Sequence, residues 1–118
     1  MLKCLPFKGN KDGQGREMIA VYIVFANEAE AKNIGTALLN DRLVACINIF
    51  PVKSSYWWHD EIHNAEEVAL IAKTKQENFD KIKDVVRSMH SYETPAIVAF
   101  RIAAGDKDYI EWVNKEVE

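Results

Sequence analysis

An unbroken β-favouring run near the start of the chain limits most strongly what it can fold into. Ile19-Ala-Val-Tyr-Ile-Val-Phe25 contains neither a charged residue nor a turn-forming one. Such a run is typical of a strand in the middle of a sheet with both of its faces covered. It is far too short to cross a bilayer, which takes about 20 apolar residues. Other strands and helices of the chain must therefore bury it.

A helix is predicted directly after this strand. Asn27 with Glu30 three residues later forms an N-cap signature, and Ile34 and Leu38 then fall on one helical face. We expect this helix to end near Arg42.

A β-hairpin is predicted for the middle of the chain. Strand patterns cover residues 44–50, 54–58 and 68–74, with an interruption at Pro51 and a polar turn at 59–61. The strand at 68–74 is expected to be the return arm of the hairpin.

The last part of the chain repeats the alternation of helix and strand. Thr74 with Glu77 is a second capping signature, and it precedes an apolar stripe at helical spacing, made of Phe79, Ile82, Val86 and Met89. Pro95 blocks continuation of that helix, residues 96–102 read as a strand, and Asp106 can cap a short terminal helix.

This order predicts an α+β fold, a ferredoxin-like βαββαβ sandwich with an extended hairpin and a short C-terminal helix. In that arrangement helices cover one face of the sheet only. Here the other face also carries apolar side chains, which leaves a large apolar surface on a lone subunit. We therefore expect self-association, with a cyclic oligomer as the usual form.

Composition narrows the possible partners and the domain organisation. The 118 residues are 48% apolar, and 15 basic against 18 acidic residues give a net charge of −3, so we expect one domain and no nucleic-acid or membrane partner. Two cysteines favour the reducing cytoplasm. Residues 1–17, rich in glycine and lysine, are expected to be a flexible N-terminal tail, native or left over from cloning, ahead of a domain at 18–118.

Two residues of the strand at 44–50 are a first candidate for chemistry. Its period of two places Cys46 and Asn48 on one face, where a thiol and an amide suit a soft-metal or nucleophilic site. The alternative is that Cys46 is a small buried apolar residue and Asn48 a hydrogen-bonded strand residue. Spacing alone favours this alternative.

The segment between the second helix and the last strand is another candidate. A loop with His90, Tyr92 and Glu93 combines an imidazole, a phenol and a carboxylate. Alternatively, His90 lies favourably near the helix C-terminus, Tyr92 packs and Glu93 is solvated. Lys73, near the end of its strand, can neutralise an anion or serve as an edge charge against aggregation.

Two histidines of the hairpin invite comparison with a metal site. One straight strand would place Trp57, His59, Glu61 and His63 on one face, but the polar cluster indicates a turn that breaks this alignment. We therefore expect solvated turn histidines, and expect Tyr56, Trp57 and Trp58 to be interface or core residues.

Several motifs in order resemble the CutA divalent-cation tolerance family over nearly all of Met18 to Glu118. They are Asp41-Arg-Leu-Val-Ala-Cys-Ile-Asn48, Ser55-Tyr-Trp-Trp58, Glu66-Glu-Val-Ala-Leu-Ile-Ala-Lys-Thr74, His90-Ser-Tyr-Glu-Thr-Pro95 and Asp108-Tyr-Ile-Glu-Trp112. The resemblance implies a homotrimer of the PII type with strands extended across neighbours. It also implies a role in tolerance of divalent cations, copper above all, without enzymatic activity.

Carried onto this chain, the resemblance matches Cys46, Lys73, His90, Tyr92 and Glu93, which would meet in clefts between subunits. Among them we expect Cys46, His90 and Glu93 to be metal ligands. We expect Lys73 and Tyr92, together with Trp58, to line the clefts. A divalent cation such as copper would be the bound ion, with no organic cofactor. The alternative is a trimeric signalling or scaffold protein that binds a small anionic ligand or an unidentified protein partner.

Two segments, a loop and a turn, depart from the family pattern. Ser91 stands where the family has proline after the loop histidine, so we expect a less rigid loop. Asp60 and Glu61 stand where the family has glycine and lysine in the hairpin turn, which puts any role of that turn in doubt.

Overall fold

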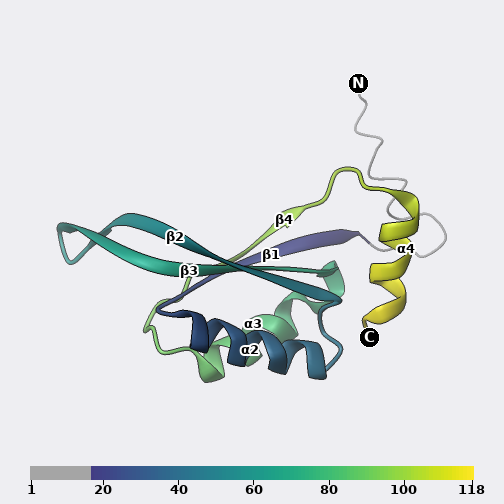
Figure 1. Cartoon of the computed structure of the whole chain (residues 1–118), viewed down its shortest axis with the longest axis horizontal. Helices are drawn as coiled ribbons and strands as arrows, with labels where there is room; N and C mark the ends of the chain where they lie inside the picture. The colour runs from purple at the N-terminus through teal and green to yellow at the C-terminus, as the bar shows by residue number, and fades with distance from the viewer. Residues whose placement is uncertain (1–16) are drawn as a thin grey trace.

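The computed structural model describes residues 17–118 and shows a four-stranded antiparallel sheet with two helices on one face and a third beside one end of the sheet (Figure 1). The strand order is β2-β3-β1-β4. The elements, in chain order, are β1 (Met18–Phe25), α2 (Glu28–Asn40), β2 (Cys46–Trp58), β3 (Glu61–Lys75), the 3₁₀ turn η1 (Gln76–Asn78), α3 (Phe79–Met89), β4 (Ile97–Arg101) and α4 (Lys107–Glu116). The predicted tail falls almost entirely on residues 1–16, outside the described residues.

Strand β1 has the central position that its apolar sequence predicts. It pairs with β3 on one side and β4 on the other, and Val21, Ile23 and Phe25 have no exposed surface. Helices α2 and α3 cover the face to which these side chains point (Figure 1). Gly35 lets α2 approach the sheet closely, because a Cβ there would lie 2.7 Å from Cδ1 of Ile47.

The first predicted helix is confirmed. The side chain of Asn27 accepts a hydrogen bond from the Glu30 N–H at 2.8 Å, which satisfies one of the unpaired donors of the first turn. The helix ends at Asn40, two residues before the expected end, and Arg42 follows in the left-handed region with φ 59°. Arg42 also pairs with Glu116 at 2.8 Å, which ties the end of α4 to this corner.

The second capping prediction is wrong. The Thr74 hydroxyl donates to the Leu43 carbonyl at 2.6 Å, and the Asn78 amide donates to the same carbonyl at 3.1 Å. Thr74 is therefore a buried residue of β3 one position before its end, and α3 begins only after the 3₁₀ turn. The predicted cap of the terminal helix is confirmed, since Asp106 accepts from the Tyr109 N–H at 3.2 Å.

The predicted interruption at Pro51 is also wrong, because β2 runs through it. Pro51 pairs with Val68 inside a continuous 13-residue strand. Strand β2 lies at the edge of the sheet, and an edge strand tolerates proline because its missing N–H can face away from the neighbouring strand. The hairpin of β2 and β3 consequently extends as one ribbon well beyond the rest of the sheet (Figure 1).

The sheet face opposite the helices, which we call the open face, carries large apolar side chains. Pairing places Tyr22 beside Val98 and Ala20 beside Phe100, all with side chains pointing away from α2 and α3. Val98 is 47% exposed and Phe100 57% exposed. The apolar second face expected from the sequence is therefore present.

No helix among residues 17–118 is long and apolar enough to span a membrane.

The hairpin turn lies at the predicted place but is one residue shorter than expected, and its geometry favours the glycine of the family pattern over Asp60. Trp58 pairs with Glu61, so the turn consists of His59 and Asp60 alone. Their φ angles are 54° and 66°. Two-residue hairpin turns with positive φ at both positions match the right-handed twist of the flanking strands. Glycine and asparagine adopt such φ angles at the lowest cost in free energy.

We expect Asp60→Gly to stabilise the protein by up to about 1 kcal/mol, because glycine removes the left-handed penalty at this position. Thermal unfolding followed by circular dichroism would show a rise of about 4 °C in Tm. The control is Glu66→Gly, within the regular part of β3, which should lower stability by about 0.5–1 kcal/mol. A similar loss in both variants would contradict this interpretation of the turn.

Candidate functional site

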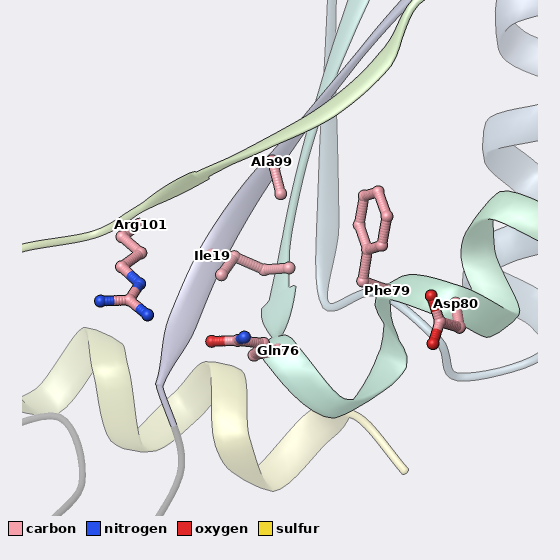
Figure 2. Close-up of a pocket in the computed structure, with 6 residues that line it drawn as sticks. All are labelled: Ile19, Gln76, Phe79, Asp80, Ala99 and Arg101. Carbon is pink, nitrogen blue, oxygen red and sulfur yellow. The ribbon is translucent and has the colours of Figure 1, made fainter.

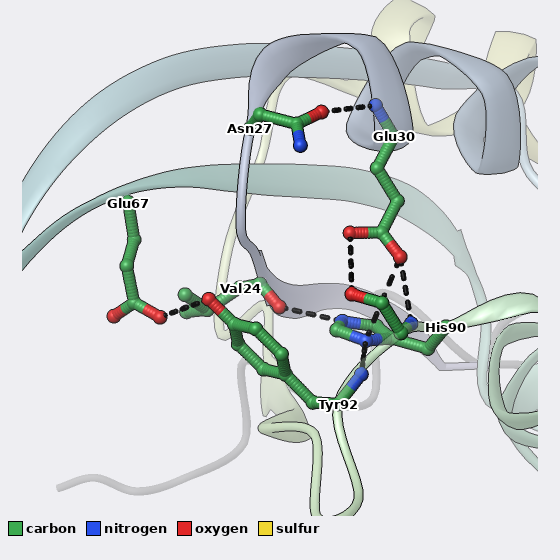
Figure 3. A network of polar contacts seen from close by, with 7 residues as sticks. Val24, Asn27, Glu30, Glu67, His90 and Tyr92 are labelled. Atoms are coloured by element: carbon green, nitrogen blue, oxygen red, sulfur yellow. Dashed lines mark hydrogen bonds and ion pairs between the residues drawn. The ribbon is translucent and has the colours of Figure 1, made fainter.

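The loop between α3 and β4 is held by a polar network around His90 (Figure 3). Nδ1 of His90 accepts the Tyr92 N–H at 3.0 Å, so Nε2 carries the proton and donates to the Val24 carbonyl at 2.7 Å. The ring also stacks on Phe25, with centroids 4.8 Å apart. The imidazole side chain has no exposed surface, and both of its nitrogens are occupied.

Glu30 at the start of α2 anchors the residue that follows His90. One carboxylate oxygen accepts the Ser91 N–H at 2.7 Å, and the other accepts the Ser91 hydroxyl at 3.0 Å (Figure 3). Proline at this position would have neither donor. Ser91 thus gives the loop two hydrogen bonds that the proline of the family pattern could not make.

Tyr92 carries the network on to the hairpin. Its hydroxyl donates to Glu67 of β3 at 2.5 Å, and Glu67 is only 8% exposed (Figure 3). Burial, followed by the hydrogen bond and negative charge of Glu67, raises the pKa of Tyr92. The neutral phenol therefore persists throughout the physiological range and fixes the loop against β3.

A groove of about 580 Å³ lies on the open face between this loop and the hairpin. We call it the hairpin groove; its lining residues are Val24, Lys53, Ser54, Ser55, Tyr56, Trp58, Glu67, Tyr92, Glu93, Thr94 and Ala96. Three of the predicted site residues, Trp58, Tyr92 and Glu93, meet here. His90 is not among the residues that line the groove.

A second set of polar side chains gathers around Cys46, at the end of the sheet that faces α4. We call Cys46, Asn48, Lys73 and Tyr109 the thiol cluster. Nζ of Lys73 donates to Asn48 Oδ1 at 3.0 Å and lies 3.9 Å from Sγ of Cys46, and the Tyr109 hydroxyl lies 3.4 Å from the same sulfur. The predicted common face of Cys46 and Asn48 is confirmed. Lys73 belongs to this cluster and is not among the residues that line the hairpin groove with Trp58 and Tyr92.

Contact with the thiol changes the acidity of Tyr109. The hydrogen bond with Cys46, followed by burial, raises the pKa of Tyr109 to about 12. Between the ordinary pKa of 10.0 and this value, the folded chain keeps a proton that the unfolded chain has lost. Tyr109 therefore contributes stability below this window and loses that contribution as pH rises through it.

The structure does not bring the three predicted metal ligands together within one subunit. Cys46 pairs with Lys73 of β3, which in turn pairs with Ala20 of β1. His90 instead bonds to the carbonyl of Val24, which lies four residues, or about 13 Å, further along β1. Within residues 17–118, no three His, Cys, Asp or Glu side chains lie close enough to hold a metal ion. His59 is in the turn and His63 stacks on Tyr56, so the two hairpin histidines also lie apart.

Several functional contacts could not be found from the sequence. Glu67, Tyr109 and Glu30 take part in these networks, but each reaches its partner across at least 25 residues of chain. For Glu67 the sequence holds one signal: side chains alternate between the two faces along β3, and this alternation places the Glu67 carboxylate on the open face. Nothing in the local pattern indicates the contact of Glu30 with Ser91.

We expect Glu30→Ala to lower the free energy of unfolding by about 2 kcal/mol, because it removes an acceptor that is charged and holds two donors. Hydrogen exchange should accelerate at residues 90–96, and denaturant unfolding gives the loss of stability. The control is Glu28→Ala, which removes an exposed carboxylate from the same helical turn. Equal effects of the two substitutions would contradict the anchoring role of Glu30.

Comparison with known proteins places these features in a family. The family model described as CutA1 divalent ion tolerance protein matches residues 19–116. The divalent-cation tolerance protein CutA of Archaeoglobus fulgidus is 44% identical over 98 residues, which are 83% of this chain and 96% of that protein. The protein of the same name from Thermotoga maritima is 41% identical, over 85% of this chain and 99% of its own length.

Solved structures agree with the sequence relatives. The structure described as the periplasmic divalent cation tolerance protein CutA from Archaeoglobus fulgidus has a TM-score of 0.84 at 42% identity, covering 86% of this chain and 99% of that one. A divalent cation tolerance protein of Thermus thermophilus has a TM-score of 0.83 at 36% identity, with the same coverage. On sequence and fold together, this chain belongs to the CutA1 divalent ion tolerance protein family.

Proposed function

We propose that the protein acts in tolerance of divalent cations as a homotrimer that binds a cation such as copper in clefts between subunits. Membership of the family carries this proposal, because divalent-cation tolerance is the function that its relatives are named for. The fold we propose for each subunit is the ferredoxin-like one, which fits the strand order and the helices on one face. A binding role suits the family better than an enzymatic one.

The apolar open face supports the homotrimer. Exposed apolar patches of this kind mark sites of protein association, and three copies that close over it would remove Val98 and Phe100 from water. The outer strands β2 and β4 support strand pairing across neighbours. Successive antiparallel pairings make β4 run antiparallel to β2, so the β4 edge of one copy can pair with the β2 edge of the next.

The proposed ligands differ in how readily they fit a cation. The Cys46 thiol is free and half-buried on the open face, and Glu93 is exposed at the rim of the hairpin groove. Thiolate, imidazole and carboxylate together suit a soft or borderline ion such as copper. His90 joins this set only by giving up one of its two hydrogen bonds, and loss of the bond from the Tyr92 N–H would loosen the loop. Clefts between subunits are where ligands from separate ends of the sheet could meet.

The compartment we propose is the cytoplasm. Two cysteines, with Cys46 unpaired, fit a reducing environment.

Copper titration tests the metal proposal. We expect Cys46→Ala and His90→Ala each to weaken copper binding at least tenfold, about 1.4 kcal/mol, because each removes one ligand. Isothermal titration calorimetry of the trimer measures affinity and stoichiometry. The control is His59→Ala, which removes an exposed histidine of the turn and should change neither. Unchanged binding in the first two variants would eliminate this site.

Sedimentation tests the homotrimer. The native chain should sediment as a trimer at micromolar concentration, and Phe100→Asp should dissociate it, because a carboxylate on the open face would be buried without a partner. Lys81→Asp carries a new carboxylate on the exposed side of α3 and should leave the trimer intact. A native chain that remains a single subunit at this concentration would refute the assembly.

A further inference from the structure

Trp57 is the most exposed large apolar residue among residues 17–118, with 71% of its surface accessible. It lies two residues before the turn, on the side of β2 that carries Ile47 and Ile49 into the core. Its cross-strand partner Ile62 is 59% exposed. The extended hairpin thus presents an apolar pair on the helix side of the sheet, beyond the reach of the helices that cover that side elsewhere.

A pocket of about 300 Å³ lies beside the opposite edge of the sheet (Figure 2). We call it the edge pocket; it is lined by Ile19, Gln76, Phe79, Asp80, Ala99 and Arg101. Figure 2 shows Ile19, Ala99 and Phe79 facing a common space, with the Arg101 guanidinium at one end. Ala99 pairs with Val21 and Arg101 with Ile19, so the pocket also opens on the helix side.

One subunit cannot bring Trp57 to its own edge pocket. Trp57 belongs to β2 and Ala99 to β4, the two outer strands of the sheet. Pairing between the β4 edge of one copy and the β2 edge of the next is antiparallel and keeps the helices of both copies on the same face. Across that joint, Trp57 of one copy and the edge pocket of the other lie on the same side. Because Trp57 is level with Ile62 and the pocket residue Ile19 is level with Thr74, about 40 Å further along the sheet, the two meet where β4 pairs with the turn end of β2.

The pocket suits an indole in size and in chemistry. A cavity of roughly 150 Å³ holds benzene, so about twice that volume accommodates the two fused rings of tryptophan. Ile19, Phe79 and Ala99 supply apolar walls. The Arg101 guanidinium, whose Nε lies 3.5 Å from Glu17, is placed to stack on the face of the ring.

We propose that Trp57 of each copy docks in the edge pocket of the next copy. The inference rests on the homotrimer proposed above and adds the contact that orders its subunits. Each copy gives one indole and receives one, so the contact is head-to-tail and is fully satisfied only in a closed ring.

A protein with Trp57 as its sole tryptophan tests this contact. The double substitution Trp58→Phe and Trp112→Phe produces this protein, because the chain has 3 tryptophans. In the trimer we expect its fluorescence to be blue-shifted and its quenching by acrylamide to be several-fold slower than for free indole. Ala99→Phe fills the pocket and should red-shift the emission and restore fast quenching. Ala99→Asp, which places a carboxylate in the apolar wall, should do the same and covers the case in which Ala99→Phe fails to fold.

The matched control is the protein with Trp58 as its sole tryptophan, because the Trp58 side chain lies on the open face. Its emission should not respond to Ala99→Phe. Sedimentation of every variant separates the two proposals. A trimer in which Trp57 is quenched like free indole, or in which Ala99 variants leave its emission unchanged, overturns the docking but leaves the trimer. A native single subunit overturns both.

Discussion

The covering of only one face of the sheet is the constraint on which the rest of this structure depends. Helices α2 and α3 bury Val21, Ile23 and Phe25 on one side. No element among residues 17–118 does the same for Val98 and Phe100 on the other. Burying apolar surface contributes roughly 25 cal/mol per Å², so the exposed face represents a substantial driving force for association. This exposed apolar face is the observation that supports the homotrimer proposed above.

Much of the fold could be predicted because its signals are local. The run at 19–25, the Asn27 cap and the Asp106 cap depend on residues close together in sequence, and each was confirmed. The predictions were wrong where a residue distant in sequence determines the local structure. Thr74 has the spacing of a helix cap, but the carbonyl of Leu43 takes its hydroxyl. Pro51 predicts an interruption of the strand, but the sheet order places it on an edge strand, where proline is tolerated.

The candidate site was predictable in its residue types but only partly in its arrangement. Period two correctly placed Cys46 beside Asn48, and the loop at 90–96 does carry Tyr92 and Glu93 into a groove with Trp58. Lys73 instead joins Cys46, because β2 and β3 pair in the register that sets these two side by side. No pattern along the chain specifies this register, nor the burial of the His90 ring against Phe25.

The two-residue turn at His59 and Asp60 has a consequence for how this chain can change length. It fixes the pairing of every residue of β2, and in a ribbon whose side chains alternate, a shift by one position moves each side chain to the opposite face. A single inserted or deleted residue in one arm would therefore turn every side chain of that arm beyond it, counted from the turn, to the face opposite its present cross-strand partner. Related chains should accordingly lengthen or shorten this ribbon by matched pairs of residues, one in each arm, or absorb an odd residue in a bulge.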